Sequence, residues 1–369
     1  MTAGMDTGWE PRPPATARRR WIGVALAVVL VGGTIVTIIV LGTSKGTGPG
    51  GSSPPSTGSC AAVKTKAKGA VSNPFGVVIP SPTLSPNDQV AIAEKLGVSY
   101  FRPHAVFLAS GTSSDDAADF IKAGFRIVLT VRNGTTLRTP STPPSSIDDY
   151  KKKIGQVIDC YHPALLVIEN EENIPSHWSG GPDAYGQMLK AACEEAHAKQ
   201  TKCTNGGLLS GAVTYMVYQH YVDTGQTAQA QSFASRAFEN FQMNLLSGPN
   251  GAVVVQQRAE AALAYVNAEK TAGADYYNFH WYVADAQAMG EAAAYLLAVT
   301  GLPLVTNEMG QRDNDPATTT GLLSEMLQLK LPIAVWYITD ARLARGLIDS
   351  SGALRPTGTT FSQFVKSHS

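Results

Sequence analysis

The sequence lacks an excess of charge of either sign. Its 369 residues include 29 Lys+Arg and 29 Asp+Glu, so the formal net charge is zero. Proteins that bind nucleic acid usually carry a basic excess or a basic stripe, so we do not expect nucleic acid as a partner. Only 16% of the residues are charged and 44% are hydrophobic. This balance supports one large domain, or two small ones, with a sizeable core.

Two further features are missing. The first predicted strand leads into "IPSPTLSPND", which has no glycine-rich turn of the kind that binds phosphate in open, doubly wound sheets. No group of His, Asp and Glu residues has the spacing of metal ligands. We therefore expect neither a metal nor another cofactor.

Residues 1–41 have the pattern of a membrane anchor. Residues 1–20 are Pro-, Thr- and Ala-rich and end in three arginines, and we expect a disordered cytoplasmic tail. The uncharged segment 21–41 is long enough for one transmembrane helix, which takes about 20 residues. By the positive-inside rule its C-terminal side lies outside the cell. A cleaved signal peptide is the alternative, which would give a secreted protein, but "LGTSKGTG" offers no clean A-x-A cleavage site.

The next segment, 42–69, is a Gly/Ser/Pro-rich linker that would hold residues 70–369 away from the membrane. An extracellular location permits disulfides. The chain has four cysteines: Cys60, Cys160, Cys193 and Cys203. A bridge among the last three is plausible, buried free thiols are the alternative, and the sequence leaves the pairing open.

From about residue 70 the chain alternates short apolar runs with longer helical patterns. Such runs are typical of parallel strands that are covered on both faces. Eight strand–helix units in roughly 300 residues predict an α/β fold of the (β/α)8 TIM-barrel class. An open doubly wound sheet is the runner-up. The predicted strands are Phe75–Ile79, Tyr100–Arg102, Ile127–Val131, Leu165–Glu169, Asn205–Leu209, Tyr276–His280, Leu304–Asn307 and Ile333–Tyr337.

The connection after the fifth strand is unusually long, and we predict a helical insertion over roughly Ala212–Gly251 that forms one wall of a cleft. Its aromatic residues have two interpretations. They could offer a surface for sugar rings, or they could pack the insertion's own small core. These residues are Tyr215, Tyr218, Tyr221 and Phe233.

Two Asn-Glu dipeptides carry the chemistry. Asn170-Glu171 closes "ALLVIENEENI" and Asn307-Glu308 closes "LPLVTNEMGQ". Each places a carboxylate just past a buried strand. Glu308 is the only acid in an apolar stretch, and a buried carboxylate without a partner is costly, so a functional role is expected. Two strand-end carboxylates, far apart in sequence, are what glycosidic bond cleavage requires.

The acids around Glu171 have different expected roles. Glu169 lies deeper in the strand and needs a cationic partner, for which Arg102 at the end of the second strand is a candidate. Glu172 is expected to point into a loop. The alternative for the whole segment is a solvated acidic rim.

Other strand ends add polar and aromatic side chains. "YYNFHWYV" supplies His280, Trp281 and Tyr282 at the sixth strand, and "IAVWYITD" supplies Trp336 at the eighth. A lone buried His more often has a structural role, but its aromatic neighbours favour a functional one. We expect Trp336 to form an apolar platform under a sugar ring.

In this order the motifs resemble the clan of retaining glycoside hydrolases with (β/α)8 barrels, whose catalytic glutamates end strands four and seven. Asn170-Glu171-Glu172-Asn173 is similar to the clan's Asn-Glu-Pro-Asn, with Glu in place of Pro, and Thr306-Asn307-Glu308-Met309-Gly310 is similar to its nucleophile segment. Residues that match the clan's strand ends two, six and eight are Arg102, His280 and Trp336. The resemblance covers about residues 72–366.

The resemblance implies a double displacement with Glu308 as nucleophile and Glu171 as acid/base. It implies that Arg102 and His280 hold Glu308 and that Asn170 bonds the sugar 2-hydroxyl. The acid must hold its proton while the nucleophile is ionised, so their environments should differ. We expect a monomer that acts on an oligo- or polysaccharide. The alternatives are a catalytically inactive carbohydrate-binding barrel, and a different barrel enzyme such as a lyase or a metal-dependent hydrolase.

Overall fold

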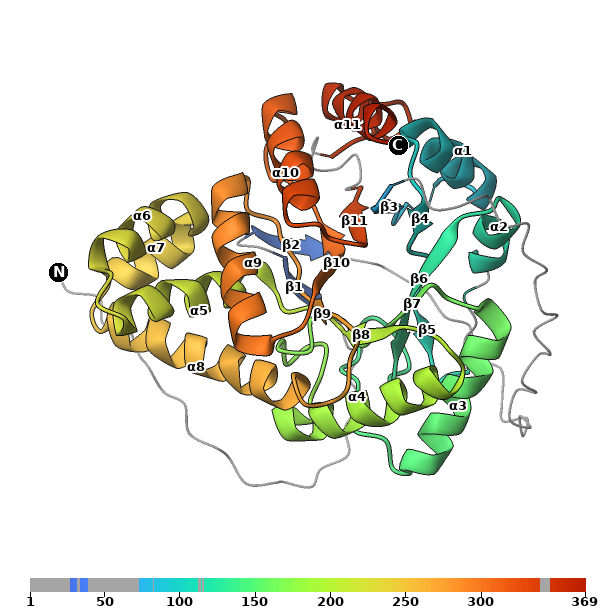
Figure 1. Cartoon of the computed structure of the whole chain (residues 1–369), viewed down its shortest axis with the longest axis horizontal. Helices are drawn as coiled ribbons and strands as arrows, with labels where there is room; N and C mark the ends of the chain where they lie inside the picture. The colour runs from blue at the N-terminus through green and yellow to red at the C-terminus, as the bar shows by residue number, and fades with distance from the viewer. Residues whose placement is uncertain are drawn as a thin grey trace, which may run out of the picture. The chain divides into compact units, whose positions relative to one another are not determined.

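The computed structural model describes residues 27–31, 34–38, 73–81, 83–111, 114, 116–338 and 346–369 (Figure 1). The chain divides into two compact units, Met1–Gly50 and Gly51–Ser369. The predicted tail over 1–20, the linker over 42–69 and Cys60 lie outside the described residues.

The larger unit is the predicted barrel. Eight strands follow one another in a parallel sheet, in the spatial order β8-β7-β6-β4-β3-β11-β10-β9. Parallel bridges from Thr204 to Tyr276 and from Leu208 to Phe279 join the two ends of this path, so the sheet closes. The short strand β5 (Val106–Phe107) pairs with β6 outside the ring. The ring consists of β3 (Phe75–Val78), β4 (Tyr100–Phe101), β6 (Arg126–Arg132), β7 (Leu165–Ile168), β8 (Cys203–Asn205), β9 (Tyr277–Asn278), β10 (Leu304–Met309) and β11 (Ala334–Tyr337).

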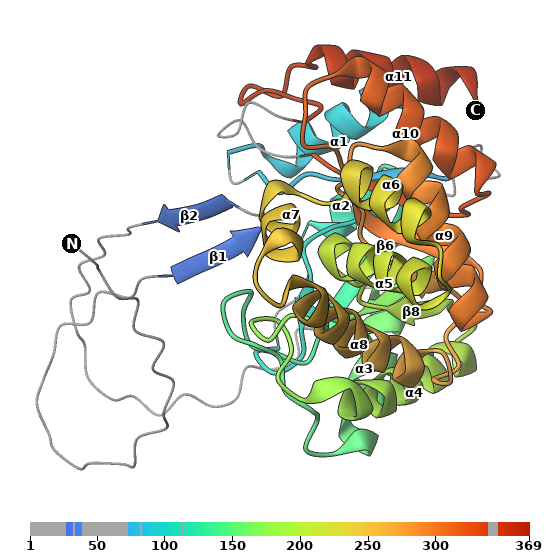
Figure 2. The same cartoon turned by 90° about the vertical axis from the view of Figure 1, so that its left-hand side faces the viewer.

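Helices follow the strands and surround the sheet, which Figures 1 and 2 show from two sides. The helix after the first strand shows how local sequence sets their ends. Ser85 caps α1 in a capping box with Asp88, Pro86 takes the first helical position, and Gly97 ends the helix at φ 80°. The predicted cap at Ser85 and terminator at Gly97 are both confirmed. The helices are α1 (Pro86–Leu96), α2 (Ala117–Lys122), α3 (Ile147–Tyr161), α4 (Gly181–Ala198), α5 (Ser210–Asp223), α6 (Thr227–Ala237), α7 (Asn240–Ser247), α8 (Gly251–Glu269), α9 (Ala286–Thr300), α10 (Pro316–Gln328) and α11 (Pro356–Ser367).

Alternation along the strands sorts side chains between two cores. Leu165 and Val167 belong to a small buried cluster with Val305 and Val335, whereas Leu166 and Ile168 belong to the large cluster that includes the helices. Successive side chains in a strand point to opposite faces. The small cluster therefore fills the barrel interior, and the same alternation decides which residues at each strand end can reach the site.

The predicted insertion after the fifth strand is helical. It comprises α5, α6 and α7, which lie together beside α8 and α9 in Figure 1. Its aromatic side chains pack with one another: the Tyr215 ring lies 5.4 Å from Phe238, and the Tyr221 ring lies 6.0 Å from Phe233. Tyr215 and Phe233 are buried. The interpretation as the insertion's own core is the one that the structure supports.

One disulfide joins two elements of the barrel. Cys193 on α4 is bonded to Cys203 at the start of β8. Cys160 is also disulfide-bonded. The predicted bridge among the three cysteines is thus confirmed for Cys193 and Cys203, and the alternative of free thiols is wrong for all three.

The described part of the N-terminal unit differs from the predicted transmembrane helix over 21–41. Ala27–Val31 (β1) and Thr34–Ile38 (β2) pair as antiparallel strands, with Val29 opposite Val36. Both segments are rich in Val, Ile and Thr, whose branched side chains suit strands. No helix among the described residues is both long and apolar enough to cross a membrane.

Candidate active site

Glu171 and Glu308 meet at the carboxyl ends of the barrel strands. Glu171 lies three residues after β7, which is the fourth strand of the ring in chain order. Glu308 is the penultimate residue of β10, which is the seventh. One carboxylate oxygen of each and one ring nitrogen of His280 all lie within 4.8 Å of one another. The barrel thus brings together two acids that are 137 positions apart (308 minus 171), as the sequence predicts.

Glu308 is held by donors on both carboxylate oxygens. Arg102 Nη1 donates to Oε2 at 2.6 Å, and the Tyr282 hydroxyl donates to Oε1 at 2.8 Å. Burial alone would raise the pKa of Glu308. The positive charges of His280 and Arg102, together with the bonds from Tyr282 and Arg102, outweigh burial and lower this pKa from 4.5 to about 2. Glu308 is therefore ionised at neutral pH, as a nucleophile must be.

Glu171 has a different environment. His280 Nδ1 lies 3.1 Å from its Oε1, and His177 Nδ1 lies 3.5 Å from its Oε2. Burial lowers the pKa of His177 below its ordinary value. The Glu171 backbone adopts a φ of 46°, in the left-handed region that few non-glycine residues occupy. Such conformations are often found at functional sites, where the surrounding structure holds them.

Arg102 ties the two glutamate segments together. Its Nε donates to the Thr130 hydroxyl at 3.1 Å, and its Nη2 donates to Asn170 Oδ1 at 2.7 Å. Its Nη1 donates both to Glu308 and to the Asn307 carbonyl. A rigid, planar guanidinium suits such simultaneous bonds. Because Asn170 Oδ1 accepts this bond, the Asn170 Nδ2 group points away from Arg102 and remains available as a donor.

His280 and Tyr282 follow β9, and the side chains of both reach the two glutamates. His280 is fully buried, and its Nε2 lies 2.9 Å from Asn307 Oδ1. Burial lowers the pKa of His280, but the carboxylates of Glu308 and Glu171 more than offset this and raise it above 6.5. The predicted contact between His280 and Glu308 is a longer one, 3.9 Å to Oε1. Tyr282 makes the direct bond instead.

Two predicted substrate-binding tryptophans have other positions. Trp281 is fully buried and its ring packs beside Phe279 at 6.4 Å. Trp336 is also buried, and its ring lies 5.5 Å from Phe361 on α11. Both side chains belong to the large core on the helix side of the sheet. The predicted platform under a sugar ring is therefore corrected: Trp281 and Trp336 are core residues.

Tyr337 occupies the end of the eighth strand where Trp336 was expected. It lies one residue further along β11, and its ring centroid is 6.3 Å from that of Tyr282. Since adjacent residues point to opposite faces, Tyr337 faces the side on which Tyr282 lies. Alternation from the interior residue Val335 would have identified it from the sequence.

His177 is a second residue that the sequence interpretation missed. It belongs to the loop after β7, six residues after Glu171. Its closeness to Glu171 in the sequence was the only indication of a role. The fold of the loop is what brings the His177 ring near the Glu171 carboxylate.

The neighbouring acids are buried and partnered within the protein. Glu169 pairs with Arg132, whose Nε lies 3.2 Å from its Oε2, and it accepts a bond from the Asn133 backbone N–H. Arg102 is thus not its partner, contrary to the prediction. Glu172, which was expected to point into a loop, lies beside Gly206 in the loop after β8, but it is fully buried and accepts a bond from Asn205 Nδ2 at 3.0 Å.

The sequence shows no group with metal-ligand spacing, but the fold brings together Glu171, His280 and Glu308, which have the residue types and distances to hold a metal ion. The Arg102 guanidinium, however, already supplies positive charge 2.6 Å from Glu308. A cation in this position would be repelled by Arg102, so the charge arrangement fits an ionised carboxylate better than a metal ligand.

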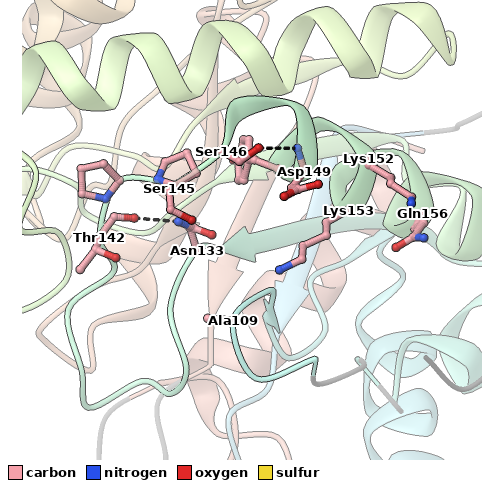
Figure 3. Close-up of a pocket in the computed structure, with 12 residues that line it drawn as sticks. Ala109, Asn133, Thr142, Ser145, Ser146, Asp149, Lys152, Lys153 and Gln156 are labelled. Carbon is pink, nitrogen blue, oxygen red and sulfur yellow. Dashed lines mark hydrogen bonds between the residues drawn. The ribbon is translucent and has the colours of Figure 1, made fainter. Parts of the chain in front are cut away.

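A polar cavity of about 480 Å³ lies between the loop after β6 and the start of α3 (Figure 3). Lys152, Lys153 and Asp149 line it, and Asn133 donates a bond to the Thr142 carbonyl there. None of the predicted site residues lines this cavity.

No family model matches the sequence, and no curated protein matches it either. Solved structures that resemble this one include an endo-beta-1,3-glucanase of GH128 subgroup II from Sorangium cellulosum, with 13% identity and a TM-score of 0.48, covering 79% of this chain and 98% of that chain. A GH128 subgroup VI exo-beta-1,3-glucanase from Aureobasidium namibiae has 8% identity and a TM-score of 0.47, with 79% and 97% covered. A GH128 subgroup VII oligosaccharide-binding protein from Trichoderma gamsii has 11% identity and a TM-score of 0.43, with 84% and 99% covered. Because these TM-scores lie below 0.5, the function is argued below from the residues of the site alone.

Proposed function

We propose that the protein is a glycoside hydrolase that cleaves O-glycosidic bonds with retention of configuration. The observation that carries this proposal is the pair Glu171 and Glu308, whose nearest carboxylate oxygens lie within 4.8 Å of each other. Carboxyl groups lie about 5–5.5 Å apart in retaining enzymes and about 6.5–9.5 Å apart in inverting ones. The short separation favours a nucleophile over a water-activating base.

In the first step, a Glu308 oxygen forms a bond to the anomeric carbon while the bond to the leaving oxygen breaks. Glu171 gives its proton to that oxygen, so the leaving group departs as an alcohol. In the second step Glu171 takes a proton from water, which attacks the anomeric carbon and releases Glu308. The first step leaves Glu171 ionised, so it can accept the proton from water, and the second step returns Glu171 to its protonated form and Glu308 to its free carboxylate.

The residues around the pair support these roles. Arg102 and Tyr282 keep Glu308 ionised and oriented. Burial, followed by the charge of Glu308, raises the pKa of the Tyr282 hydroxyl well above 10, so Tyr282 stays a donor. Asn170, turned by Arg102, is placed to bond a sugar 2-hydroxyl through Nδ2, a type of contact that strengthens in the transition state.

For the substrate we propose a neutral oligo- or polysaccharide at the cell surface, reached by a barrel held outside the cell through the N-terminal segment 21–41. The zero net charge supports a neutral substrate. The Cys193–Cys203 disulfide supports an oxidising, extracellular compartment.

The test is a screen of the protein against aryl glycosides, laminari-oligosaccharides and cell-envelope polysaccharides, with Glu308→Gln as the matched control. Wild type should release sugar with retained anomeric configuration, as read by NMR of the first product, and Glu308→Gln should not. Product of inverted configuration would refute the assignment of Glu308 as nucleophile. Binding of a saccharide without turnover would instead support the carbohydrate-binding alternative.

A further inference from the structure

Three asparagines form a buried row across neighbouring strands of the barrel. Asn205 ends β8, Asn278 ends β9 and Asn307 lies in β10, and each is at most 1% exposed. Buried amides are hydrogen-bonded as a rule, and here they bond mainly to one another. The double displacement described above uses none of their side chains.

Backbone groups fix the direction of every bond in this row. The Asn278 N–H donates to Asn205 Oδ1 at 2.7 Å, and the Asn307 N–H donates to Asn278 Oδ1 at 2.9 Å. A backbone N–H can only donate, so both side-chain atoms must be oxygens. Asn278 Nδ2 then donates to the Asn205 carbonyl at 3.0 Å and to Asn307 Oδ1 at 2.6 Å.

The row ends on His280. Because Asn307 Oδ1 is an acceptor, His280 Nε2, which lies 2.9 Å away, must carry a hydrogen. The other ring nitrogen, Nδ1, lies 3.1 Å from Glu171 Oε1. Nδ1 therefore has no hydrogen in the neutral ring and can accept one from Glu171, whereas in the imidazolium Nδ1 donates to the Glu171 carboxylate.

The far end of the row is anchored on a buried acid pair. Asn205 Nδ2 donates to Glu172 Oε1, and the Glu172 carboxyl group interacts with that of Glu269 at the end of α8. Both acids are at most 1% exposed. Two adjacent buried carboxyl groups cannot both be ionised, so they share a proton, and Glu172 Oε1 remains an acceptor for Asn205.

The backbone after β8 is shaped around both ends of the row. A Cβ atom at Gly206 would lie 2.5 Å from Glu172 Oε2, and one at Gly207 would lie 2.5 Å from His280 Nε2. Gly207 also has a φ of 97°, which side-chain-bearing residues rarely adopt. Only glycine at both positions lets the acid and the imidazole lie so close to this loop.

We propose that Asn205, Asn278 and Asn307 are positioning residues that hold His280 with its hydrogen on Nε2, so that a single mobile proton is shared between His280 and Glu171. The catalytic consequence rests on the proposed function, because only there is Glu171 the acid. A neutral imidazole with its hydrogen on Nδ1 would instead donate to an ionised Glu171 and leave no proton for the leaving group. The charged and titratable groups that face His280 and Glu171 are Arg102, Glu172, His177, Tyr282 and Glu308.

The first test reads the tautomer directly. The full chain is labelled with nitrogen-15 in its seven histidines, and His280 is identified by the signals lost in His280→Gln. In the neutral form, Nε2 should carry the hydrogen and only Nδ1 should titrate. A neutral form with the hydrogen on Nδ1, or a mixture of both forms, would overturn the proposal. This measurement needs no substrate, and the only variant that it needs is His280→Gln, for the assignment.

The second test changes the row by one atom. Asn307 Nδ2 has no hydrogen-bond partner among the described residues, so Asn307→Asp keeps both acceptor bonds and adds a negative charge beside His280. The His280 titration midpoint should rise by about one pH unit or more, and the alkaline limb of kcat/KM should move with it. The same substitution at exposed Asn250 is the control and should move neither. An unchanged midpoint in a folded Asn307→Asp variant would contradict the proposal.

The two readouts separate this inference from the proposed function. A protein with the Nε2 tautomer that hydrolyses no glycoside would keep the inference about His280 and lose the assignment as a hydrolase. Hydrolysis with the Nδ1 tautomer would do the reverse.

Discussion

Glu308 and His280 stabilise each other's charged forms, and this coupling gives a prediction at the residue scale. After burial, the charge of Glu308 is the strongest influence on the pKa of His280, and it raises that pKa. Glu308→Gln should therefore lower the His280 titration midpoint by about one pH unit. The same variant should lose more than about a thousandfold in kcat, because the nucleophile is gone.

Nitrogen-15 NMR and hydrolysis assays measure the two effects on one sample. Glu291→Gln, which removes a carboxylate paired with Arg236 on the insertion, is the control and should leave both unchanged. A His280 midpoint that does not fall in Glu308→Gln would mean that Glu308 is not the group that supports the imidazolium.

Trp336 gives a second prediction at this scale. Its ring packs on Phe361 in the core, so Trp336→Phe should lower the free energy of unfolding by about 1–3 kcal/mol. It should leave the KM for oligosaccharides unchanged. Urea unfolding and steady-state kinetics check the two expectations. A raised KM with unchanged stability would restore the original interpretation of Trp336 as a substrate platform.

The sequence also predicts which face of a strand each residue occupies, which the motifs alone do not. Alternation along a strand places His280 and Tyr282 on one face and Trp281 on the other, and it separates Tyr337 from Trp336 in the same way. The asparagine row could not be predicted, because it depends on which strands become neighbours and on their register. The same is true of the pairing of Glu169 with Arg132.

At the scale of elements, the eight predicted strands are all present, and the largest deviation is in the fifth. It spans Cys203–Asn205 rather than Asn205–Leu209, because Gly206 and Gly207 end it. Apolar runs predict where a strand lies. They do not predict that two glycines end it to make room for Glu172 and His280, because that depends on tertiary contacts. That the insertion forms one wall of a cleft stays a prediction, whereas its aromatic side chains pack against one another.

The contact between α8 and the β7 loop gives a prediction about stability. Burial, then the charge of Glu172, raises the pKa of Glu269 well above its ordinary value of 4.5. A raised pKa in the folded state gives stability that is fully present below about pH 4.5 and is lost as the pH rises through the folded value. The free energy of unfolding of the wild type should therefore fall as the pH rises from about 4.5 to the pKa that Glu269 has in the folded protein.

Glu269→Gln removes the titration, because an amide can donate to Glu172 at every pH. The free energy of unfolding of Glu269→Gln should exceed that of wild type at pH 8 and approach it near pH 4.5, as measured by urea unfolding at both values. Glu260→Gln, on the same helix but exposed, should show no such difference. Equal pH dependence in wild type and Glu269→Gln would mean that Glu269 is not the protonated partner.

At the scale of the whole molecule, the fold and the proposed location depend on different parts of the chain. All described barrel strands lie between Phe75 and Tyr337, and the site residues lie between Arg102 and Tyr337. The hydrophobic segment 21–41 belongs to the other compact unit. Fold and site can thus be tested without the N-terminal unit, and location can be tested with it.

A fragment that comprises Gly51–Ser369 keeps every barrel strand and all four cysteines. It should unfold at the same urea concentration as the full chain and hydrolyse the same substrate with the same kcat/KM. The full chain should sediment with membranes in the cell of origin and the fragment should not, because segment 21–41 is the proposed anchor. If both sediment alike while both are active, the anchor proposal fails and the assignment of Glu171 and Glu308 stands. If the fragment loses activity, the N-terminal unit contributes to the site, and the boundary between fold and anchor must be moved.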